Sequence, residues 1–366
     1  MGSFTQTLGR ALAARGHRIT AVGIYPIRRV IEEKDQGVQV IRLPHAFLPR
    51  TGFWINGDRL RKALSQIHRQ SPIDIIDGPE LSLAFLPKRF PVLKIIRMNG
   101  GHHFFSVTLG KRPDFWKSWK EKRSFRRADF FCAVSRFIAQ KTQSLLPLER
   151  LPVEILYNPV DTQFFSPRSR EKEDDGLILF VGTVCEKKGI RQLIQAMPQI
   201  ISKVPQARLR VVGRDWKDPR TGESYIRYLQ GSIPESLRSQ IFFEGPIEHS
   251  MLPDIISKAA VCVYPSHIEA FGIACLEGMA AGKAVVTSNT GPGPEVLQDE
   301  ISGLLCNPFD PRSIAGKVIS LLTDPGLRRR LGEQARLRAL NLFSIDALAE
   351  RNEIFYQRCL EEHSRG

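Results

Sequence analysis

The sequence has no apolar run that approaches the roughly 18 residues needed to cross a membrane. Its first residues contain neither the basic nor the apolar region of a secretory signal peptide. The six cysteines include no Cys-x-x-Cys pair and lie mostly within apolar runs, which is typical of buried thiols in a reducing compartment. We therefore expect a cytoplasmic protein whose contact with a membrane, if any, is peripheral and at the inner face.

Sequence patterns that hold metal ions are also lacking. No Asp-x-Asp occurs in a loop, and Asp74 and Asp77 fall within or directly at the end of an expected strand. No cluster of histidines and carboxylates offers an alternative site. The sequence predicts neither a metal site nor a bound cofactor.

Length and composition indicate a globular chain of two domains. Its 366 residues exceed what one hydrophobic core usually serves, and a hydrophobic content of 42% is ordinary for a soluble fold. Internal repeats and low-complexity segments are absent.

Charge is distributed unevenly between the two halves. Residues 1–165 carry 27 Lys and Arg against 13 Asp and Glu, a balance of +14, whereas the remaining 201 residues carry 26 against 25, a balance of +1. The first half is therefore the part that we expect to meet an anionic partner.

The densest basic run covers residues 115–127, in which Trp116 and Trp119 interleave with six basic residues: Lys117, Lys120, Lys122, Arg123, Arg126 and Arg127. A helix would place residues 116, 119 and 123 on one face. Such a helix fits an anionic lipid surface, at about 1 kcal/mol per basic residue, or a solvated helix whose tryptophans pack inward. Nucleic acid is the other common partner of such charge, but no recognisable nucleic-acid module accompanies the run, so we expect none.

The second half of the chain alternates between strand and helix patterns, which predicts a parallel, doubly wound sheet. Helical periodicity covers residues 190–201 and 311–322. The expected strands are 177–184, 208–212, 241–243, 261–264, 284–287 and 304–305. In such sheets ligands bind beyond the carboxyl ends of the strands, where Gly182, Gly213, Gly245 and Pro265 fall.

The first half shows the same alternation more weakly. A helical pattern over residues 4–15 ends at Gly16-His17. The expected strands are 19–24, 38–43, 73–76, 93–98, 130–134 and 155–156. Residues 343–362 form an amphipathic tail.

Glu269 and Glu277 lie on either side of the expected start of a helix between two short apolar strands. Gly272 lacks a Cβ, so a ligand can approach the N–H groups of the first helical turn, where the helix dipole favours anions. The Cβ of Glu277 tilts toward the helix N-terminus, so both carboxylates flank the same place. Because a carboxylate can accept two hydrogen bonds from paired sugar hydroxyls, the pattern predicts a sugar-nucleotide site. The alternative is that each glutamate only caps or solvates the helix.

This stretch resembles the nucleotide-sugar site of the retaining glycosyltransferases of family 4, which have the GT-B fold. Three further segments resemble family elements in the same order. Residues 158–161 resemble the interdomain segment, residues 180–190 the strand, loop and helix that supply phosphate-binding cations, and residues 290–295 the Gly-rich loop on the sugar side. The resemblance covers most of the chain.

The resemblance implies an α/β fold of two Rossmann-like, doubly wound domains that face a central cleft. Residues 1–165 correspond to the acceptor-side domain and 177–342 to the nucleotide-sugar-binding domain, with a linker at 166–176 whose polar composition suits a hinge. Residues 343–366 correspond to a C-terminal helix that returns to the first domain. The implied donor is a nucleoside diphosphate sugar, and the implied acceptor is a saccharide or lipid-linked saccharide.

The expected donor-binding residues are Gly182, Thr183, Lys188, Gly213, Arg214, Phe271, Gly272, Ile273 and Glu277. The expected catalytic residues are Glu269, Lys188, His102 and His103. In the family a histidine commonly stands at the end of the strand that corresponds to residues 93–98. One alignment places His102 or His103 at that position, and the other places Asn99-Gly100 there. A histidine there can donate to a sugar hydroxyl or orient an acceptor.

Two departures from the family pattern affect these expectations. The family has a first strand and a Gly-rich loop before the opening helix, and both are absent here, so we expect either an upstream start or a shortened protein. Thr183 stands where the family usually has an arginine, so one phosphate contact is lost or passes to Lys187, Arg191 or Arg214.

The resemblance implies metal-independent transfer of a hexose-type sugar with retention of configuration, in the assembly of cell-surface polysaccharide or glycolipid. Three other functions stay open. A nucleotide-sugar epimerase of the same fold would convert the free donor alone. A membrane-associated scaffold would keep the basic first domain without a working donor site. A nucleic-acid-binding protein would explain the net charge of +15 but not the pair of glutamates.

Overall fold

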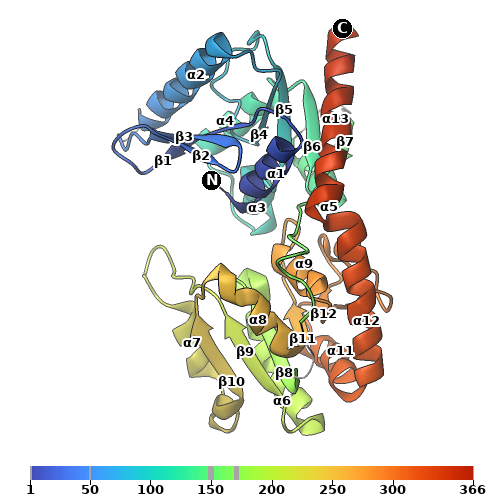
Figure 1. Ribbon diagram of the computed structural model, residues 1–366. Helices are drawn as coiled ribbons and strands as arrows, with labels where there is room; N and C mark the ends of the chain where they lie inside the picture. Colours follow the sequence, from blue (N-terminus) through green and yellow to red (C-terminus); the bar gives the residue numbers. More distant parts are fainter. Residues whose placement is uncertain (1, 49–50, 147–151, 169–172, 366) are drawn as a thin grey trace. The chain divides into compact units, whose positions relative to one another are not determined.

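The computed structural model describes residues 2–48, 51–146, 152–168 and 173–365. The chain forms two compact units, coloured along the sequence in Figure 1. The N-terminal unit contains Met1–Pro159 and Ile345–Gly366, and the C-terminal unit contains Val160–Ser344.

The C-terminal unit is built on one six-stranded sheet in which every strand pair is parallel. The strands are β8 (Asp174–Val181), β9 (Arg208–Val212), β10 (Ile241–Gly245), β11 (Ala259–Tyr264), β12 (Ala284–Ser288) and β13 (Leu304–Cys306). Their order across the sheet is β10-β9-β8-β11-β12-β13, so the direction of winding reverses between β8 and β11. The doubly wound parallel sheet expected from the sequence is confirmed.

Helices cover this sheet. They are α6 (Ile190–Lys203), α7 (Tyr225–Ser232), α8 (Leu252–Lys258), α9 (Ile273–Ala280), α10 (Gly293–Val296), α11 (Pro311–Thr323) and α12 (Pro325–Arg338), with short helical turns at Glu186–Lys188, Glu235–Gln240, His249–Met251 and Ala339–Phe343. Aspartates 310 and 324 cap α11 and α12 by accepting backbone N–H groups, and a proline opens each helix.

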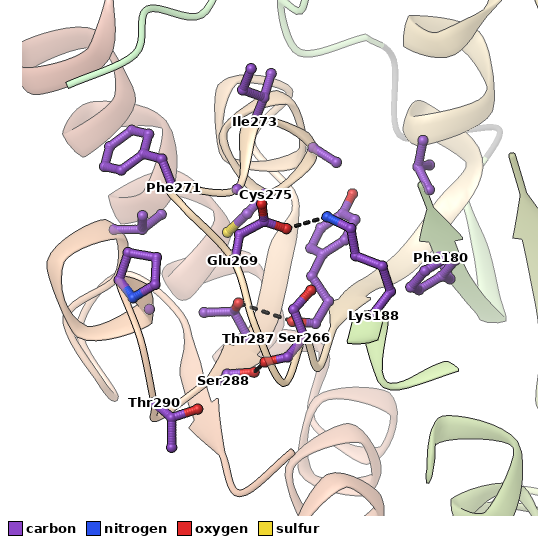
Figure 2. A pocket seen from close by; sticks show the side chains of 17 residues that line it. Phe180, Lys188, Ser266, Glu269, Phe271, Ile273, Cys275, Thr287, Ser288 and Thr290 are labelled. Atoms are coloured by element: carbon purple, nitrogen blue, oxygen red, sulfur yellow. Dashed lines mark hydrogen bonds and ion pairs between the residues drawn. The ribbon is translucent and has the colours of Figure 1, made fainter. Parts of the chain in front are cut away.

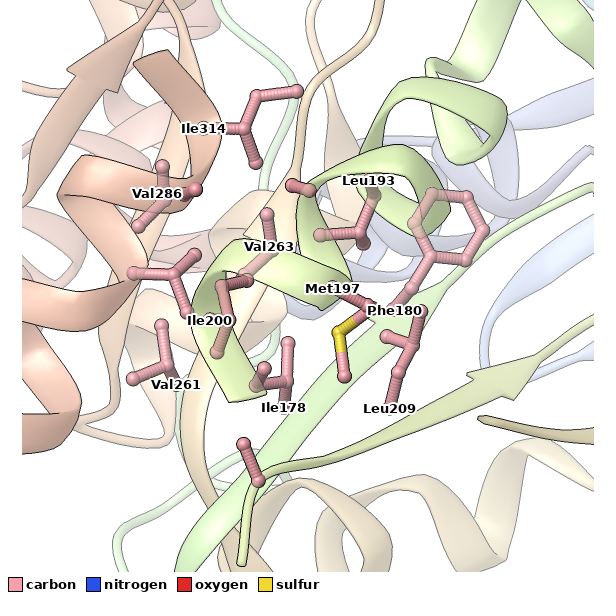
Figure 3. Close-up of a cluster of buried hydrophobic side chains, with 14 of the residues drawn as sticks. Ile178, Phe180, Leu193, Met197, Ile200, Leu209, Val261, Val263, Val286 and Ile314 are labelled. Atoms are coloured by element: carbon pink, nitrogen blue, oxygen red, sulfur yellow. The ribbon is translucent and has the colours of Figure 1, made fainter. Parts of the chain in front are cut away.

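The core of the C-terminal unit lies between α6, α11 and the sheet. Phe180 of β8 and Leu209 of β9 pack near Met197 of α6 in Figure 3, and all are essentially buried. All six residues of β11 are buried. Strands of a parallel sheet covered on both faces are expected to be this uniformly apolar.

The N-terminal unit contains two separate sheets instead of the single sheet that the sequence suggested. The strands are β1 (Thr20–Tyr25), β2 (Ile31–Asp35), β3 (Val38–Pro44), β4 (Ile75–Pro79), β5 (Leu93–Met98), β6 (Phe130–Ala133) and β7 (Val153–Ile155). One sheet has the order β1-β3-β2 and the other β4-β5-β6-β7. Among the described residues no ladder joins β1 to β4, so the two sheets remain distinct.

Strand β2 was not expected from the sequence. It pairs antiparallel with β3 through the two-residue turn Gln36-Gly37, where both φ angles are positive, at 46° and 87°. Such a turn matches the twist of a hairpin. Charged, exposed residues dominate β2, so its hydrophobic pattern gave no signal.

The helices of the N-terminal unit are α1 (Ser3–Ala14), α2 (Gly52–Gln70), α3 (His102–Thr108), α4 (Phe115–Phe125), α5 (Arg136–Leu145) and α13 (Ile345–Arg365). Gly16, with φ of 92°, follows α1 and accommodates the left-handed conformation that commonly ends a helix. Within the described ranges, no helix is both long and apolar enough to cross a membrane.

Helix α13 is the last element of the chain but packs on the first one, and Figure 1 shows it beside α1. Arg15 donates to Glu353 over 2.8 Å. The buried Arg97 of β5 also contacts α13: it donates to Asp77 over 2.6 Å and to Asn352 of α13 over 2.7 Å. A buried guanidinium therefore ties α13 to the four-stranded sheet.

The segment 166–176, expected to be a linker, lies partly outside the described residues. Of the described part, residues 174–176 begin strand β8. Glu173 accepts from Lys283 over 2.5 Å and from Arg328 over 3.1 Å, so this acidic side chain is fixed to the C-terminal unit.

Replacing Asn352 by leucine should lower the free energy of unfolding of the N-terminal unit by about 2–3 kcal/mol, because Arg97 loses a buried acceptor. Urea unfolding followed by circular dichroism measures the change. The exposed Glu361 on the same helix provides the control, and Glu361→Ala should alter stability by less than about 0.5 kcal/mol. Equal effects of the two substitutions would show that the Arg97 network does not hold α13.

Candidate functional site

A pocket opens at the carboxyl ends of β8, β11 and β12, where the winding of the C-terminal sheet reverses. Its empty volume is about 510 Å³, and it is open to solvent. Val181 of β8, Ser266 after β11 and Ser288 of β12 line it, together with the start of α9. This is the position at which doubly wound sheets bind their ligands.

The loop between β8 and α6 carries Lys188 into this pocket. Gly189 ends the short helical turn with φ of 70°, and a Cβ on this residue would lie 1.8 Å from the carbonyl oxygen of Pro265. The backbone of Lys187 accepts from the N–H groups of His267 and Ile268 over 2.9 and 3.3 Å. Only glycine permits so close an approach, which joins this loop to the one after β11.

Lys188 and Glu269 form an ion pair inside the pocket, and Figure 2 shows the two side chains directed toward one another. Each side chain is about one-quarter exposed, at 24% for Lys188 and 26% for Glu269. A partly exposed pair of this kind can be opened by a ligand, because water screens part of its attraction. An anion beside Lys188 would leave Glu269 available for hydroxyl groups.

Helix α9 starts beside this ion pair. Gly272 precedes it with φ of 94°, and Phe271, Gly272, Ile273 and Ala274 all line the pocket. The N–H groups at the start of a helix have no acceptor within it and can bind an anion. The pocket therefore combines a cation, backbone donors and a carboxylate.

Glu277 lies in the next turn of α9 and does not line the pocket itself. Glu277 is 8% exposed, and no described residue donates a hydrogen bond to its carboxylate. Nε2 of His249 lies 3.9 Å from its Oε1. Burial raises the pKa of Glu277 to about 7. A buried carboxyl without a donor needs an explanation, and contact with a ligand is one candidate.

Further polar groups complete the pocket wall. Thr287 donates to the carbonyl of Tyr264 over 3.1 Å, and Ser288 donates to that of Ser266 over 2.5 Å, as the dashed lines in Figure 2 mark. The buried Tyr264 hydroxyl has no hydrogen-bond partner among the described residues. These hydroxyls were not singled out from the sequence, although Thr287 ends an expected strand, which is the signal that could have identified it.

Four expected donor-binding residues lie at the ends of β8 and β9 without lining the pocket: Gly182, Thr183, Gly213 and Arg214. A Cβ on Gly213 would lie 1.8 Å from the carbonyl oxygen of Gly182, so the two strand ends are in close contact. The side chain of Arg214 is exposed.

Arg191, considered as a substitute phosphate ligand, is engaged elsewhere. It donates to Glu186 over 3.0 and 2.5 Å, and the hydroxyl of Tyr225 donates to the same carboxylate. The Arg191 guanidinium, aided by Tyr225, holds the pKa of Glu186 at about 2. The charge of Arg191 is therefore largely balanced by Glu186.

His102 and His103 begin helix α3 of the N-terminal unit. The buried carboxylate of Glu121 on α4 accepts their backbone N–H groups over 2.8 and 2.9 Å and also contacts Nδ1 of His103. A Cβ on Gly101 would lie 1.8 Å from this carboxylate, so the contact requires glycine there. Glu121 was overlooked in the sequence because it stands within a basic run.

The ring nitrogens of the two histidines have different surroundings. Nε2 of His102 accepts from the backbone of Asp114 over 2.8 Å. Glu80, buried next to the same loop, accepts from the backbone of Asn99 over 2.5 Å, and burial raises the pKa of this glutamate to about 7. His103 is thus held by a carboxylate, whereas His102 is held by the backbone.

Replacing Glu277 by glutamine should stabilise the protein more at pH 8 than at pH 5. Because the pKa of Glu277 is raised from 4.5 to about 7, ionisation of the buried carboxyl destabilises the folded state as pH rises through this window. The difference between the two pH values should be about 2–3 kcal/mol. Urea unfolding at both pH values measures this difference, with Glu235→Gln at an exposed position as control. An effect of Glu277→Gln that does not depend on pH would contradict the raised pKa of Glu277.

Comparison with known proteins agrees with this arrangement. The sequence profile described as glycosyl transferases group 1 matches residues 161–338, and the profile described as glycosyltransferase family 4 matches residues 1–164. An uncharacterized glycosyltransferase of Methanocaldococcus jannaschii, MJ1607, is 30% identical over 63% of this chain and 60% of its own. The chain thus spans less than two thirds of the length of that relative.

Two solved structures resemble the fold over nearly its whole length. Sucrose-phosphate synthase of Thermosynechococcus elongatus has a TM-score of 0.80 and 25% identity, with 97% of this chain and 92% of the other covered. Anabaena Alr3699/HepE, solved in complex with UDP-glucose, has a TM-score of 0.75 and 16% identity, with 96% and 94% covered. Since the two profiles follow one another along almost the entire chain, this protein belongs to the group 1 glycosyltransferases of the family 4 type, which have the GT-B fold.

Proposed function

We propose that this protein transfers a hexose-type sugar from a nucleoside diphosphate sugar to a hydroxyl group of a saccharide acceptor, with retention of configuration. The observation that carries the proposal is the Lys188–Glu269 pair beside the start of α9 at the switch point of the sheet. It brings a cation for phosphate next to a carboxylate for sugar hydroxyls. Structural similarity to HepE, which was solved in complex with UDP-glucose, supports a donor of this class.

The diphosphate would lie between Lys188 and the first N–H groups of α9. Negative charge grows on this group as it departs, and fixed cations and backbone dipoles stabilise that charge. Arg214, whose side chain is exposed at the end of β9, would supply the contact that Thr183 cannot make. A charge-assisted hydrogen bond of this kind contributes about 1.5–3 kcal/mol.

The two glutamates would bind different sugars. Glu277, buried and without a hydrogen-bond donor among the described residues, would accept the ribose hydroxyls of the nucleotide. Glu269 would hold hydroxyls of the transferred hexose and steady positive charge at its anomeric carbon. The different surroundings of the two carboxylates support this division, because one is paired with a cation and the other is not.

Retention would proceed without a covalent sugar–enzyme intermediate. The bond between the anomeric carbon and the phosphate oxygen breaks while the acceptor oxygen approaches the same face of the sugar. The proton of the acceptor hydroxyl passes to an oxygen of the departing diphosphate, and the new glycosidic bond forms on that face. His103, held by Glu121, would orient the acceptor or donate to a sugar hydroxyl.

Nucleoside diphosphates and their sugars should raise the melting temperature of the protein, since binding at about 100 times Kd adds roughly 2.7 kcal/mol. A panel of UDP, GDP, ADP and their sugar derivatives, followed by thermal unfolding, identifies the base. Lys188→Met should abolish the shift, and Arg214→Met should reduce it, because both remove phosphate contacts. Lys317→Met, elsewhere in the same unit, is the control; an undiminished shift in Lys188→Met would refute the phosphate assignment.

Hydrolysis of the selected nucleotide sugar, with water as acceptor, should release a sugar of the same anomeric configuration as the donor. Proton NMR at early times, before mutarotation, distinguishes the anomers. Glu269→Gln should slow release by about 100-fold or more while nucleotide binding persists. Release of the opposite anomer would exclude retention, and conversion of the donor into an isomeric nucleotide sugar would favour the epimerase.

A further inference from the structure

The tryptophans of this protein are concentrated on one face of the N-terminal unit. Three of the four in the chain, Trp54, Trp116 and Trp119, gather where α2 meets α4. The ring centroids of Trp54 and Trp119 are 5.7 Å apart, and those of Trp116 and Trp119 are 6.5 Å apart. Phe53 joins the group at 5.8 Å from Trp116. The cluster thus depends on two helices that are distant in sequence.

The base of this cluster is packed, but its outer part is exposed. Helix α2 approaches Phe85 closely at Gly57, where a Cβ would lie 2.1 Å from the ring. In contrast, Trp54 is 46% exposed and Trp116 is 54% exposed. Phe47 and Leu48 lie shortly before α2, where the Leu48 carbonyl accepts the N–H of Gly52 over 2.8 Å, and Phe115 begins α4; each of the three is more than half exposed. We call these three residues, together with Trp54 and Trp116, the aromatic face. Large apolar side chains gathered in this way indicate an interaction surface.

The structure changes which basic residues can serve this face. Arg123 donates to the carbonyl of Ala84 over 2.9 Å and lies over the ring of Trp119, and Arg127 donates to the carbonyl of Leu86 over 2.6 Å. Both were expected to take part in a basic stripe, but they hold α4 to the unit instead. Lys120 lies over the ring of Phe53 at 5.4 Å, and burial lowers its pKa.

The charges left beside the aromatic face are mainly positive. Lys111, Arg112 and Lys117 are exposed next to Phe115 and Trp116 in the chain. Of the nearby acids, Glu121 is buried, whereas Asp114 is exposed and keeps its negative charge while it accepts the N–H of Lys117 as the cap of α4. Asp58 of α2 is paired with Arg61 and Lys62. The face is therefore complementary to a negatively charged surface.

We propose that the aromatic face docks this protein on an anionic lipid surface. Tryptophan and phenylalanine side chains are suited to the boundary between headgroups and acyl chains, and neighbouring lysines and arginines are attracted to anionic headgroups. The docking surface consists of residues of the N-terminal unit, whereas the pocket consists of residues of the C-terminal unit. If the proposed transfer reaction also holds, the acceptor is a lipid-linked saccharide, and this extension rests on the proposed function.

Binding to vesicles tests the proposal directly. The full chain carrying Trp216→Phe retains only tryptophans of the cluster, so its fluorescence reports on this region alone. Vesicles of phosphatidylcholine mixed with phosphatidylglycerol should shift the emission to shorter wavelength, and brominated lipid should quench it. The protein should bind vesicles of pure phosphatidylcholine at least about tenfold more weakly, because the basic residues lose their anionic partners.

A matched pair of variants locates the surface. Trp116→Ser with Lys117→Glu should reduce cosedimentation with anionic vesicles at least tenfold. The chain repeats the same dipeptide at Trp216-Lys217, where Trp216 is 42% exposed in the C-terminal unit, and Trp216→Ser with Lys217→Glu should not reduce it. Circular dichroism and the melting shift caused by nucleotides should be unchanged in the first variant, which separates loss of docking from loss of the donor site.

Three outcomes would overturn the proposal. The first is equal binding to neutral and anionic vesicles, or none at all by folded protein. The second is vesicle binding that persists in Trp116→Ser with Lys117→Glu. The third is that the face binds another partner, seen as a dimer in sedimentation velocity or as a complex with a single-stranded oligonucleotide. This would hold if the same variant abolishes that complex and vesicles do not compete with it.

Discussion

The candidate site depends on the close approach of two backbones, those of Gly189 and Pro265. Because Gly189 has no Cβ and adopts a positive φ, the loop after β8 can lie directly against the loop after β11. The hydrogen bonds from His267 and Ile268 to Lys187 then hold the two loops together. As a result Lys188 and Glu269, which are 81 residues apart, meet over the point at which the sheet reverses its winding. A rigid parallel sheet thereby positions residues that two loops supply.

The two carboxylates of the candidate site would respond differently to a ligand. Glu269 is already paired with Lys188, so a phosphate that binds Lys188 would weaken this ion pair while it forms its own contact with the lysine. Glu277 has no donor among the described residues, and its buried carboxyl would gain hydrogen bonds from the hydroxyl groups of a bound sugar. Binding of one ligand would thus replace the partner of Glu269 and supply hydrogen-bond donors to Glu277.

Local patterns in the sequence were sufficient to predict the C-terminal unit. Buried parallel strands such as β11 are continuously apolar, and the glycines that follow them mark the ligand-binding edge. The two-glutamate motif also identified the start of α9. Strand β2 escaped prediction because its exposed charges carry no alternation and its hairpin turn uses glutamine where asparagine or aspartate is usual.

Contacts between distant segments were the other features that the sequence did not disclose. Glu121 and Trp54 are ordinary residues in their own segments, and their importance follows from His103 and Trp119, which the fold brings to them. The ion pair between Lys188 and Glu269 was also unforeseen, since each residue was assigned a separate ligand contact. Tertiary pairing of this kind has no periodicity by which a single sequence could reveal it.

The position of α13 in the chain has a consequence for synthesis. A ribosome makes the 185 contiguous residues of the C-terminal unit before it makes α13, so that unit can close first, while Arg97 still lacks Asn352. Until then the Arg97 guanidinium lacks both acceptors that α13 supplies, Asn352 and the Tyr356 hydroxyl, and the apolar surface that Phe355 and Cys359 later cover stays open. The part of the chain that is made first is therefore the part that is completed last, and it is the one for which assistance by a chaperone would matter most.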